Sequence, residues 1–255
     1  GIGNCVGSQQ AALEDPQWAN TYQVRHVAPD IFLCANVGAV QLNLSYDVNH
    51  CQRAVDMIEA DALILHLNPL QEALQPEGDT RFGDLLSKIE AVCRALPVPV
   101  IVKEVGSGIS ADVARKLVEA GVRALDVAGA GGTSWREVER YRARSSKADR
   151  VARHFRDWGI PTADSISMVK QVVPHAPVIA SGGLETGLDA AKCVALGADL
   201  ASLAWPLLKP ALLSVDATVE AMREIIETLR IVMFCIGAHD IAALKVTPYL
   251  EEVHR

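Results

Sequence analysis

The sequence predicts an α/β protein whose parallel strands alternate with helices and form a TIM (β/α)8 barrel. Its 255 residues hold seven short apolar segments, which stretches with helical spacing separate almost throughout. Parallel strands need such crossover connections. The segments are continuously apolar, which is typical of a sheet covered on both faces. Nearly every one ends in a polar or glycine-rich turn, and in a barrel these turns meet around one mouth.

Seven strands are one fewer than a closed barrel contains. The first apolar segment starts within the opening residues, without a preceding helix or cap. We therefore expect residues 1–255 to form a single (β/α) barrel domain that is N-terminally incomplete, with the first strand and the segment before it absent. An open, doubly wound parallel sheet is the alternative.

The expected elements follow this alternation along the chain. Residues 1–8 form a strand that enters a turn, and residues 9–20 mix helix and loop. Apolar runs predict the later strands, at 31–36, 62–67, 98–103, 123–128, 177–181 and 199–204. Helical spacing and stop signals predict helices at 49–59, 82–96, 110–120 and over most of 216–245. A further helix follows the turn at 157–162, with Thr162 and Asp164 as candidate caps.

Composition and charge narrow the class of protein. Half of the residues are apolar, and the formal charge of −7 argues against nucleic-acid binding, which favours basic surfaces. Arginines gather in 136–156, where a solvated basic face is a better interpretation than a patch that attracts substrate. The six cysteines are dispersed without a CxxC pair, as in a cytoplasmic protein with reduced thiols. No apolar run is long enough to span a membrane, and no apolar leader opens the chain, so we expect a cytoplasmic protein.

The stretch around Gly182 and Gly183 is the strongest candidate for an anion site. The apolar run 177–180 leads into these glycines, and a segment with helical spacing follows. Glycines let backbone N–H groups approach a ligand without an intervening Cβ, and a helix N-terminus adds partial positive charge. With the next turn, at Ala201 and Ser202, the pattern is typical of the phosphate site of barrels. An ordinary tight turn is the alternative.

Lys103 ends an apolar run, where a buried ammonium group needs a negative partner or an exit to solvent. We expect it to face a ligand, with a pairing to Glu104 or Asp126 as the alternative. The glycines at 131–132, followed by Thr133, offer backbone donors and a hydroxyl group. A plain turn would have the same composition.

The segment 66–72 concentrates polar side chains after one strand. His66, Asn68, Gln71 and Glu72 place an imidazole, two amides and a carboxylate in one loop. This set suits a polar anion with bound Mg²⁺, because Mg²⁺ often takes one or two protein carboxylates and adds substrate phosphate oxygens. The alternatives are a hydrogen-bonded core histidine and a solvated surface acid.

Eight motifs occur in chain order. They are Val-Gly-Ser-Gln at 6–9, Ala-Asn-Val-Gly-Ala at 35–39, His-Leu-Asn-Pro-Leu-Gln-Glu at 66–72, Pro-Glu-Gly-Asp at 76–79, Val-Lys-Glu-Val-Gly at 102–106, Asp-Val-Ala-Gly-Ala-Gly-Gly-Thr-Ser-Trp at 126–135, Asp-Trp-Gly-Ile-Pro-Thr at 157–162 and Ala-Ser-Gly-Gly-Leu at 180–184. Together they resemble type 2 isopentenyl-diphosphate isomerases over nearly the whole chain. The resemblance implies a TIM barrel that uses FMN and Mg²⁺ to interconvert isopentenyl and dimethylallyl diphosphates.

The resemblance also implies roles for individual residues. The flavin ring system would be held by Ser8, Asn36, Lys103 and Thr133, and the flavin phosphate by the backbone at Gly182, Gly183, Ala201 and Ser202. Catalysis would depend on Gln71, His66 and Asn68, substrate contact on Ser8, Gln9 and Gln71, and Mg²⁺ binding on Glu72. NADPH would reduce the flavin, and the protein would be a homo-oligomer.

The sequence departs from the family pattern in three respects. Gln10 and Glu185 stand where the family usually has arginine. Glu185 would put a negative charge near the flavin phosphate unless its side chain turns away. The N-terminal Arg-Lys and Met-Thr-Gly-Gly motifs of the family have no match in these residues.

We therefore predict a flavin-dependent allylic isomerase, in which reduced FMN acts as acid and base while the double bond of the substrate shifts. One alternative is an FMN-dependent oxidase or dehydrogenase. The turns after 180 and 204 lack the histidine and arginine that such enzymes often use. The other is a catalytically incompetent FMN-binding fragment or interaction protein.

Overall fold

The computed structural model describes residues 1–251, and they divide into two compact units. The first unit comprises 1–105, 115–125 and 136–156, and the second comprises 106–114, 126–135 and the chain from 157 onward. The boundary crosses strand β5 (Ala124–Asp126), since Ala124 and Leu125 belong to the first unit and Asp126 to the second.

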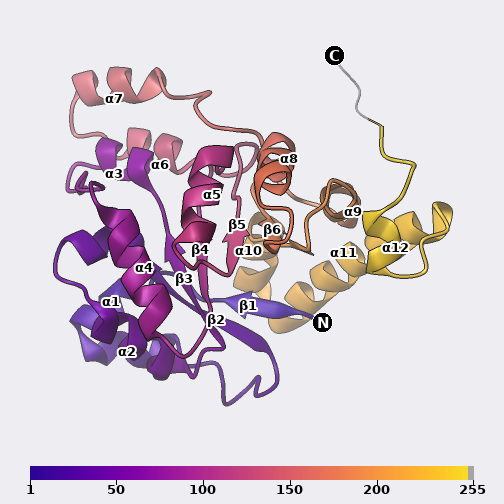
Figure 1. Ribbon diagram of the computed structural model, residues 1–255, viewed down its shortest axis with the longest axis horizontal. Coiled ribbons are helices and arrows are strands. Elements are labelled where there is room, and N and C mark those ends of the chain that lie inside the picture. The colour runs from indigo at the N-terminus through magenta and orange to yellow at the C-terminus, as the bar shows by residue number, and fades with distance from the viewer. Residues whose placement is uncertain (252–255) are drawn as a thin grey trace. The chain divides into compact units, whose positions relative to one another are not determined.

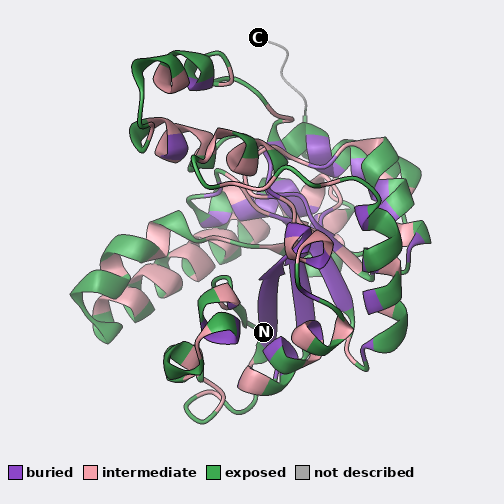
Figure 2. Ribbon diagram, turned by 90° about the vertical axis from the view of Figure 1, so that its left-hand side faces the viewer, coloured by how far each residue is buried: buried purple, intermediate pink, exposed green. Residues whose placement is uncertain are grey.

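The first unit is built on four parallel strands, β1 (Gly3–Cys5), β2 (Phe32–Gly38), β3 (Ala62–His66) and β4 (Val100–Lys103). Each strand pairs with the next one along the chain, as Figure 1 shows. Arg123 N donates to the Val100 carbonyl at 2.8 Å, which extends the sheet to the start of β5. Nearly all residues of β2 and β3 are buried (Figure 2), so this sheet is covered on both faces.

The helical segments of the first unit are α1 (Gln10–Glu14), η1 (Pro16–Thr21), η2 (Ala39–Asn43), α2 (Val48–Ile58), α3 (Pro69–Leu74), α4 (Leu85–Ala95) and α7 (Ser146–Arg153). Two more, α5 (Ala111–Glu119) and α6 (Trp135–Tyr141), cross the unit boundary. A capping box between Asp47 and His50 starts α2, and Glu59 ends it with a φ of 52°. The buried face of α2, with Val55 and Ile58, packs on β2 and β3.

The second unit contains strands β6 (Val178–Ala180) and β7 (Leu200–Ala201), which pair in parallel. Val127 N donates to the Ile179 carbonyl at 3.0 Å, so β6 follows directly on the Asp126 end of β5. Strand order in this unit therefore follows the chain, from the Asp126 end of β5 through β6 to β7. The helices of this unit are α8 (Thr162–Val172), α9 (Gly187–Ala195), α10 (Trp205–Leu213), α11 (Val215–Cys235) and α12 (Ile241–Lys245).

An apolar core joins α9, α11 and α12, which Figure 1 shows side by side. Ala191 and Val194 of α9 pack there with Ala238 and Leu244. No residue of α10 is buried, although this helix carries Trp205 and several leucines. Every helix described is too short or too polar to cross a membrane.

The structure confirms the predicted alternation of strands and helices. It corrects the last strand, because β7 ends at Ala201 and the chain then bends into α10, which has a proline in its first turn. It also adds α3, α6, α7 and α10, which the sequence analysis did not predict. Among the cysteines, Cys34, Cys51 and Cys193 are buried, and all six are free thiols. The single-domain organisation stays a prediction.

Candidate active site

Three neighbouring positions mark the carboxyl end of the strands in the first unit. The pairing register places Gly38 opposite His66, and His66 opposite Lys103. In barrel enzymes this end carries the reacting groups. A Cβ on Gly38 would lie 3.2 Å from His66 Nε2, so the glycine leaves room for the imidazole. The sheet thus brings together two predicted site residues that lie far apart in the sequence.

His66 is held in place by Asn36. Its Nδ1 lies 2.9 Å from Asn36 Oδ1, and Asn36 Nδ2 donates to the Val6 carbonyl at 3.0 Å. The amide oxygen therefore faces the imidazole, which assigns the proton to Nδ1 and leaves Nε2 as an acceptor. Burial, and secondarily the charge of Lys103, lowers the pKa of His66 to about 4. At pH 7 His66 is thus a neutral hydrogen-bond acceptor.

Lys103 is half-buried, and its Nζ donates to the Glu104 carbonyl at 2.7 Å. The carboxylate of Glu104 accepts from the Val105 amide at 2.6 Å. Lys103 therefore does contact Glu104, which was the alternative to a ligand, but through the backbone carbonyl of that residue. A carbonyl dipole does not neutralise an ammonium ion, so the charge of Lys103 can stabilise an anion at this end of the sheet.

Gln9 and Ser8, both predicted to contact substrate, lie in different surroundings. Gln9 has 0% exposure: its Nε2 donates to the Ala54 carbonyl at 2.9 Å, and its Oε1 accepts from the Asn36 amide at 2.9 Å. The side chain therefore ties β2 to α2, and a substrate contact by Gln9 stays a prediction. Ser8 is exposed, and its carbonyl accepts from the Tyr22 hydroxyl at 2.7 Å.

The polar loop predicted at 66–72 forms the start of α3. Asn68 Nδ2 donates to Glu72 Oε1 at 2.8 Å, and Glu72 Oε2 accepts from the Asp79 amide at 2.8 Å. Asn68 is 5% exposed, and its Oδ1 has no hydrogen-bond partner among the described residues. Because a buried oxygen without a partner is costly, this atom marks a position for a ligand, a water molecule or a metal ion.

Gln71 is held by a carboxylate that the sequence analysis did not single out. Glu139, 1% exposed, accepts from Gln71 Nε2 at 3.1 Å and from Arg142 Nη1 at 2.8 Å. Arg142 also pairs with Glu77 at 2.8 Å. The segment 136–156 is therefore not simply a solvated basic face. The acidic residues interspersed with the arginines of this segment were the signal in the sequence that pointed to Glu139.

The donor set around Glu72 fits Mg²⁺. Within residues 1–251, no three His, Cys, Asp or Glu side chains are arranged to hold a metal ion. Mg²⁺ does not need such a cluster, because it keeps several waters and binds one or two carboxylates together with substrate phosphates. Each Glu72 oxygen accepts one N–H and has a lone pair left, and the Asn68 oxygen lies in the same group.

In the second unit, two glycine-rich turns pack directly on each other. A Cβ on Gly182 would lie 2.2 Å from the Gly129 carbonyl oxygen, and one on Gly132 would lie 2.5 Å from Gly183 N. Gly182 and Gly183 have φ values of 95° and 81°, which side chains with a Cβ rarely adopt. Contact between the two backbones therefore requires glycine at these positions.

The amides of Gly182, Gly183 and Leu184 have no hydrogen-bond partner in the part of the chain that the structure describes. They lie shortly before α9, whose N-terminus adds partial positive charge. Unpaired amides before a helix are the donor set of an anion site, and they fit a flavin phosphate. Ser202 differs, because its amide donates to the Ala180 carbonyl at 2.8 Å. Phosphate binding at Ala201 and Ser202 stays a prediction.

Three further positions named in the sequence analysis lie at or near the surface. Thr133 and Glu185 are exposed, and the Glu185 amide donates to Asp189 Oδ2 at 3.2 Å. Gln10 Nε2 donates to Glu14 Oε1 at 2.9 Å. The flavin contact assigned to Thr133 stays a prediction.

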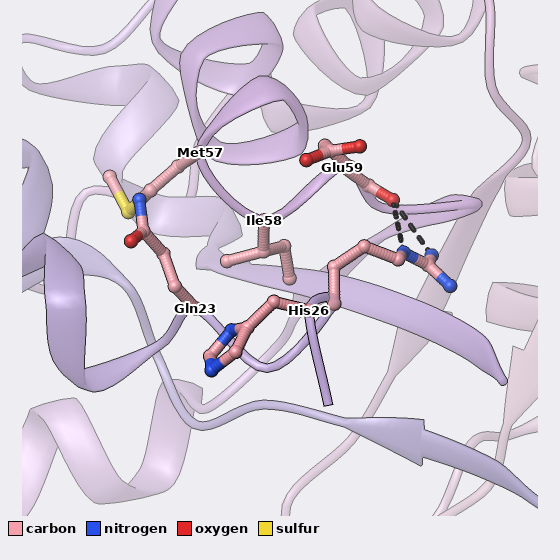
Figure 3. Close-up of a pocket in the computed structure, with 6 residues that line it drawn as sticks. Gln23, His26, Met57, Ile58 and Glu59 are labelled. Carbon is pink, nitrogen blue, oxygen red and sulfur yellow. Dashed lines mark hydrogen bonds between the residues drawn. The ribbon is translucent and has the colours of Figure 1, made fainter. Parts of the chain in front are cut away.

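The first unit also contains a pocket that none of the predicted site residues lines. Gln23, His26, Met57, Ile58 and Glu59 line it, with the guanidinium of Arg25 bound to the Glu59 carbonyl at 2.7 Å (Figure 3). The lining comes from the segments that precede β2 and β3. Barrel enzymes place their chemistry at the other end of the strands, so this pocket is not the candidate active site.

Comparison with known proteins first defines the class. Residues 47–250 match the family described as FMN-dependent dehydrogenase. A solved mandelate oxidase variant superposes with a TM-score of 0.63 at 17% identity, covering 96% of this chain and 77% of that one. A lactate oxidase structure from Pediococcus acidilactici gives 0.59 at 17% identity, covering 86% and 60%. The predicted TIM-barrel fold class is confirmed, and it is the barrel of FMN-dependent enzymes.

The curated relatives are more specific. An isopentenyl-diphosphate delta-isomerase of Nostoc is 54% identical over 94% of this chain and 69% of its own length. The Synechocystis protein of the same name is 54% identical over 97% and 71%, and that of Stutzerimonas stutzeri 52% over 96% and 71%. This chain therefore belongs to the FMN-dependent isopentenyl-diphosphate delta-isomerases.

Proposed function

We propose that this chain catalyses the FMN- and Mg²⁺-dependent interconversion of isopentenyl and dimethylallyl diphosphates. The observation that carries the proposal is the group formed by His66, Lys103 and the Asn68–Glu72 segment at the carboxyl ends of β3 and β4. It occurs in a chain about half identical to enzymes named for this reaction. The reaction moves a proton between carbons as the double bond shifts, so it needs a proton-exchanging group and cations for the diphosphate.

Bound FMN in its reduced form would supply the acid–base group for this proton shift. Lys103 would set its ammonium beside the flavin ring and favour the anionic reduced form. Asn36, Ser8 and Thr133 would provide further ring contacts, as the family resemblance implies. The amides at 182–184 would bind the flavin phosphate, because they are unpaired donors before a helix.

Glu72 would bind Mg²⁺, with the unpartnered Asn68 oxygen as a neighbouring ligand for the ion or its water. The ion would neutralise charge on the substrate diphosphate. Gln71 would lie beside the reacting carbons, in the orientation that Glu139 imposes. His66 would accept a hydrogen bond through Nε2 and would hold no positive charge near neutral pH. NADPH as reductant, a homo-oligomeric state and a cytoplasmic location complete the proposal.

The FMN-dependent oxidase or dehydrogenase is the second candidate, because the matching family is described as FMN-dependent dehydrogenase. Its chemistry requires a base that accepts a proton from substrate. The turn after β6, residues 181–186, contains no histidine or arginine. This favours the isomerase.

The test is turnover of isopentenyl diphosphate by the 255-residue chain with dithionite-reduced FMN and Mg²⁺, followed by proton NMR in D₂O. We expect dimethylallyl diphosphate, deuterium incorporation, and loss of both with EDTA or with oxidised FMN. NADPH in place of dithionite tests the reductant. Flavin binding without turnover would support the incompetent fragment. Hydrogen peroxide release from a 2-hydroxy acid would support the oxidase.

A further inference from the structure

Thr162 links the two glycine-rich turns of the second unit. It is the first residue of α8 and is 8% exposed, but its side chain does not cap that helix, contrary to the sequence-based expectation. The hydroxyl instead donates to the Gly182 carbonyl at 2.5 Å, with the Ser181 carbonyl at 3.2 Å. The Thr162 amide donates to the Ala130 carbonyl, in the other turn, at 3.3 Å.

The hydrogen bond to Gly182 fixes the direction of a neighbouring amide. In a trans peptide the C=O and N–H bonds point in opposite directions, and the described chain has no cis peptide bond. A Gly182 carbonyl aimed at Thr162 therefore turns the Gly183 N–H away from Thr162. That N–H is one of the donors without a partner in the described part of the chain.

The two peptides of this turn depend on Thr162 to different extents. The Ser181 carbonyl also accepts from the Gly129 amide at 2.9 Å, so the Gly182 N–H keeps its direction without Thr162. The Gly182 carbonyl, in contrast, accepts its side-chain hydrogen bond from Thr162. The Gly182–Gly183 peptide joins two glycines, whose backbone dihedrals vary easily, and would rotate if this bond were lost.

We propose that Thr162 is a positioning residue: through the Gly182 carbonyl, it aims the Gly183 N–H at the phosphate of the bound flavin. The inference rests on the proposed FMN function and adds a residue that need touch neither flavin nor substrate. Without the Thr162 hydroxyl, the Gly183 N–H is no longer aimed at the phosphate. The charged ligand then loses one hydrogen-bond donor, which weakens binding by about tenfold to a hundredfold. The effect is confined to ligands that carry the phosphate.

The experiment compares the dissociation constants of FMN and of riboflavin, which lacks the phosphate, by quenching of flavin fluorescence. The variants are Thr162→Val, which is close in shape, and Thr162→Ser, which keeps the hydroxyl. Ser165→Ala is the matched control, because Ser165 is buried in the same helix and donates to the Ile109 carbonyl at 2.8 Å, in neither turn. The ³¹P NMR shift of bound FMN is the second readout.

We expect wild type to prefer FMN over riboflavin. Thr162→Val should bind FMN at least about tenfold more weakly, with a shifted ³¹P signal and an unchanged affinity for riboflavin. Thr162→Ser and Ser165→Ala should keep the wild-type preference. An unchanged preference in Thr162→Val, or equal losses for both flavins, would overturn the positioning role. If the valine variant does not fold by circular dichroism, Thr162→Ala replaces it under the same criteria. Wild type that binds neither flavin would contradict the FMN proposal itself.

Discussion

Lowering the pH from 7 to 4 should destabilise the folded protein through His66. Its pKa is about 4 in the folded state, against an ordinary value of 6.5, first because of burial and then because of the Lys103 charge. Between these two values the unfolded chain binds a proton that the folded protein does not bind. The free energy of unfolding therefore falls as the pH is lowered through this window.

The size of the effect follows from the two pKa values. Relative to pH 7, His66 should remove about 2 kcal/mol of stability by pH 5 and about 3 kcal/mol by pH 4. The structural cause is first the burial of the imidazole and then the ammonium group of Lys103. A protonated ring would have to place a second charge next to Lys103.

The assay is urea unfolding of wild type and His66→Gln at pH 7, 6, 5 and 4.5. Glutamine keeps an N–H donor for Asn36 but cannot be protonated, so the difference between the two curves isolates the histidine. Contributions of aspartates with lowered pKa, such as Asp61 and Asp199, cancel in this difference. The variant His154→Gln controls for the loss of an exposed histidine. Curves that fall in parallel for wild type and His66→Gln would refute the reasoning.

Three further predictions test the cofactor, the metal and the glycine turn. The chromophore released on denaturation should be FMN, identified by its mass. FAD would contradict the proposal, because backbone N–H groups close the proposed site around a terminal phosphate. Glu72→Gln should keep FMN affinity but lose most Mg²⁺-dependent turnover, while Glu119→Gln, at an exposed position, should titrate with Mg²⁺ as wild type does. Gly182→Ala should lower the free energy of unfolding by about 1–3 kcal/mol, because the added Cβ would clash with the Gly129 carbonyl. Gly83→Ala is the control, since a Cβ there meets nothing within 4 Å.

Local pattern in the sequence was sufficient to locate most of the strands and the glycine-rich turns. Apolar runs and helical spacing depend only on neighbouring residues, so β2, β3, β4 and their helices were predicted close to their observed bounds. Paired glycines signal a conformation that other residues rarely adopt, and Gly182 and Gly183 do have positive φ. Helices α3 and α10 have only six and nine residues, which is too short for a clear periodicity of apolar residues, and the sequence did not predict them for that reason.

The direction of each side chain was decided by tertiary structure. Gln9 stands beside Ser8 in the sequence, yet its amide is buried between β2 and α2 because both of its polar ends find backbone partners there. Glu139 meets Gln71 only because a segment far along the chain folds back onto α3.

The sequence by itself determined the alternation of strands and helices, the polar ends of the strands and the family. Each of these depends on residue type and local spacing, which the chain carries before it folds. The structure alone decided that Asn36 orients the His66 ring and that Thr162 binds the glycine turn instead of capping α8. Such contacts depend on strand register and side-chain rotamers, and packing of the complete chain sets both.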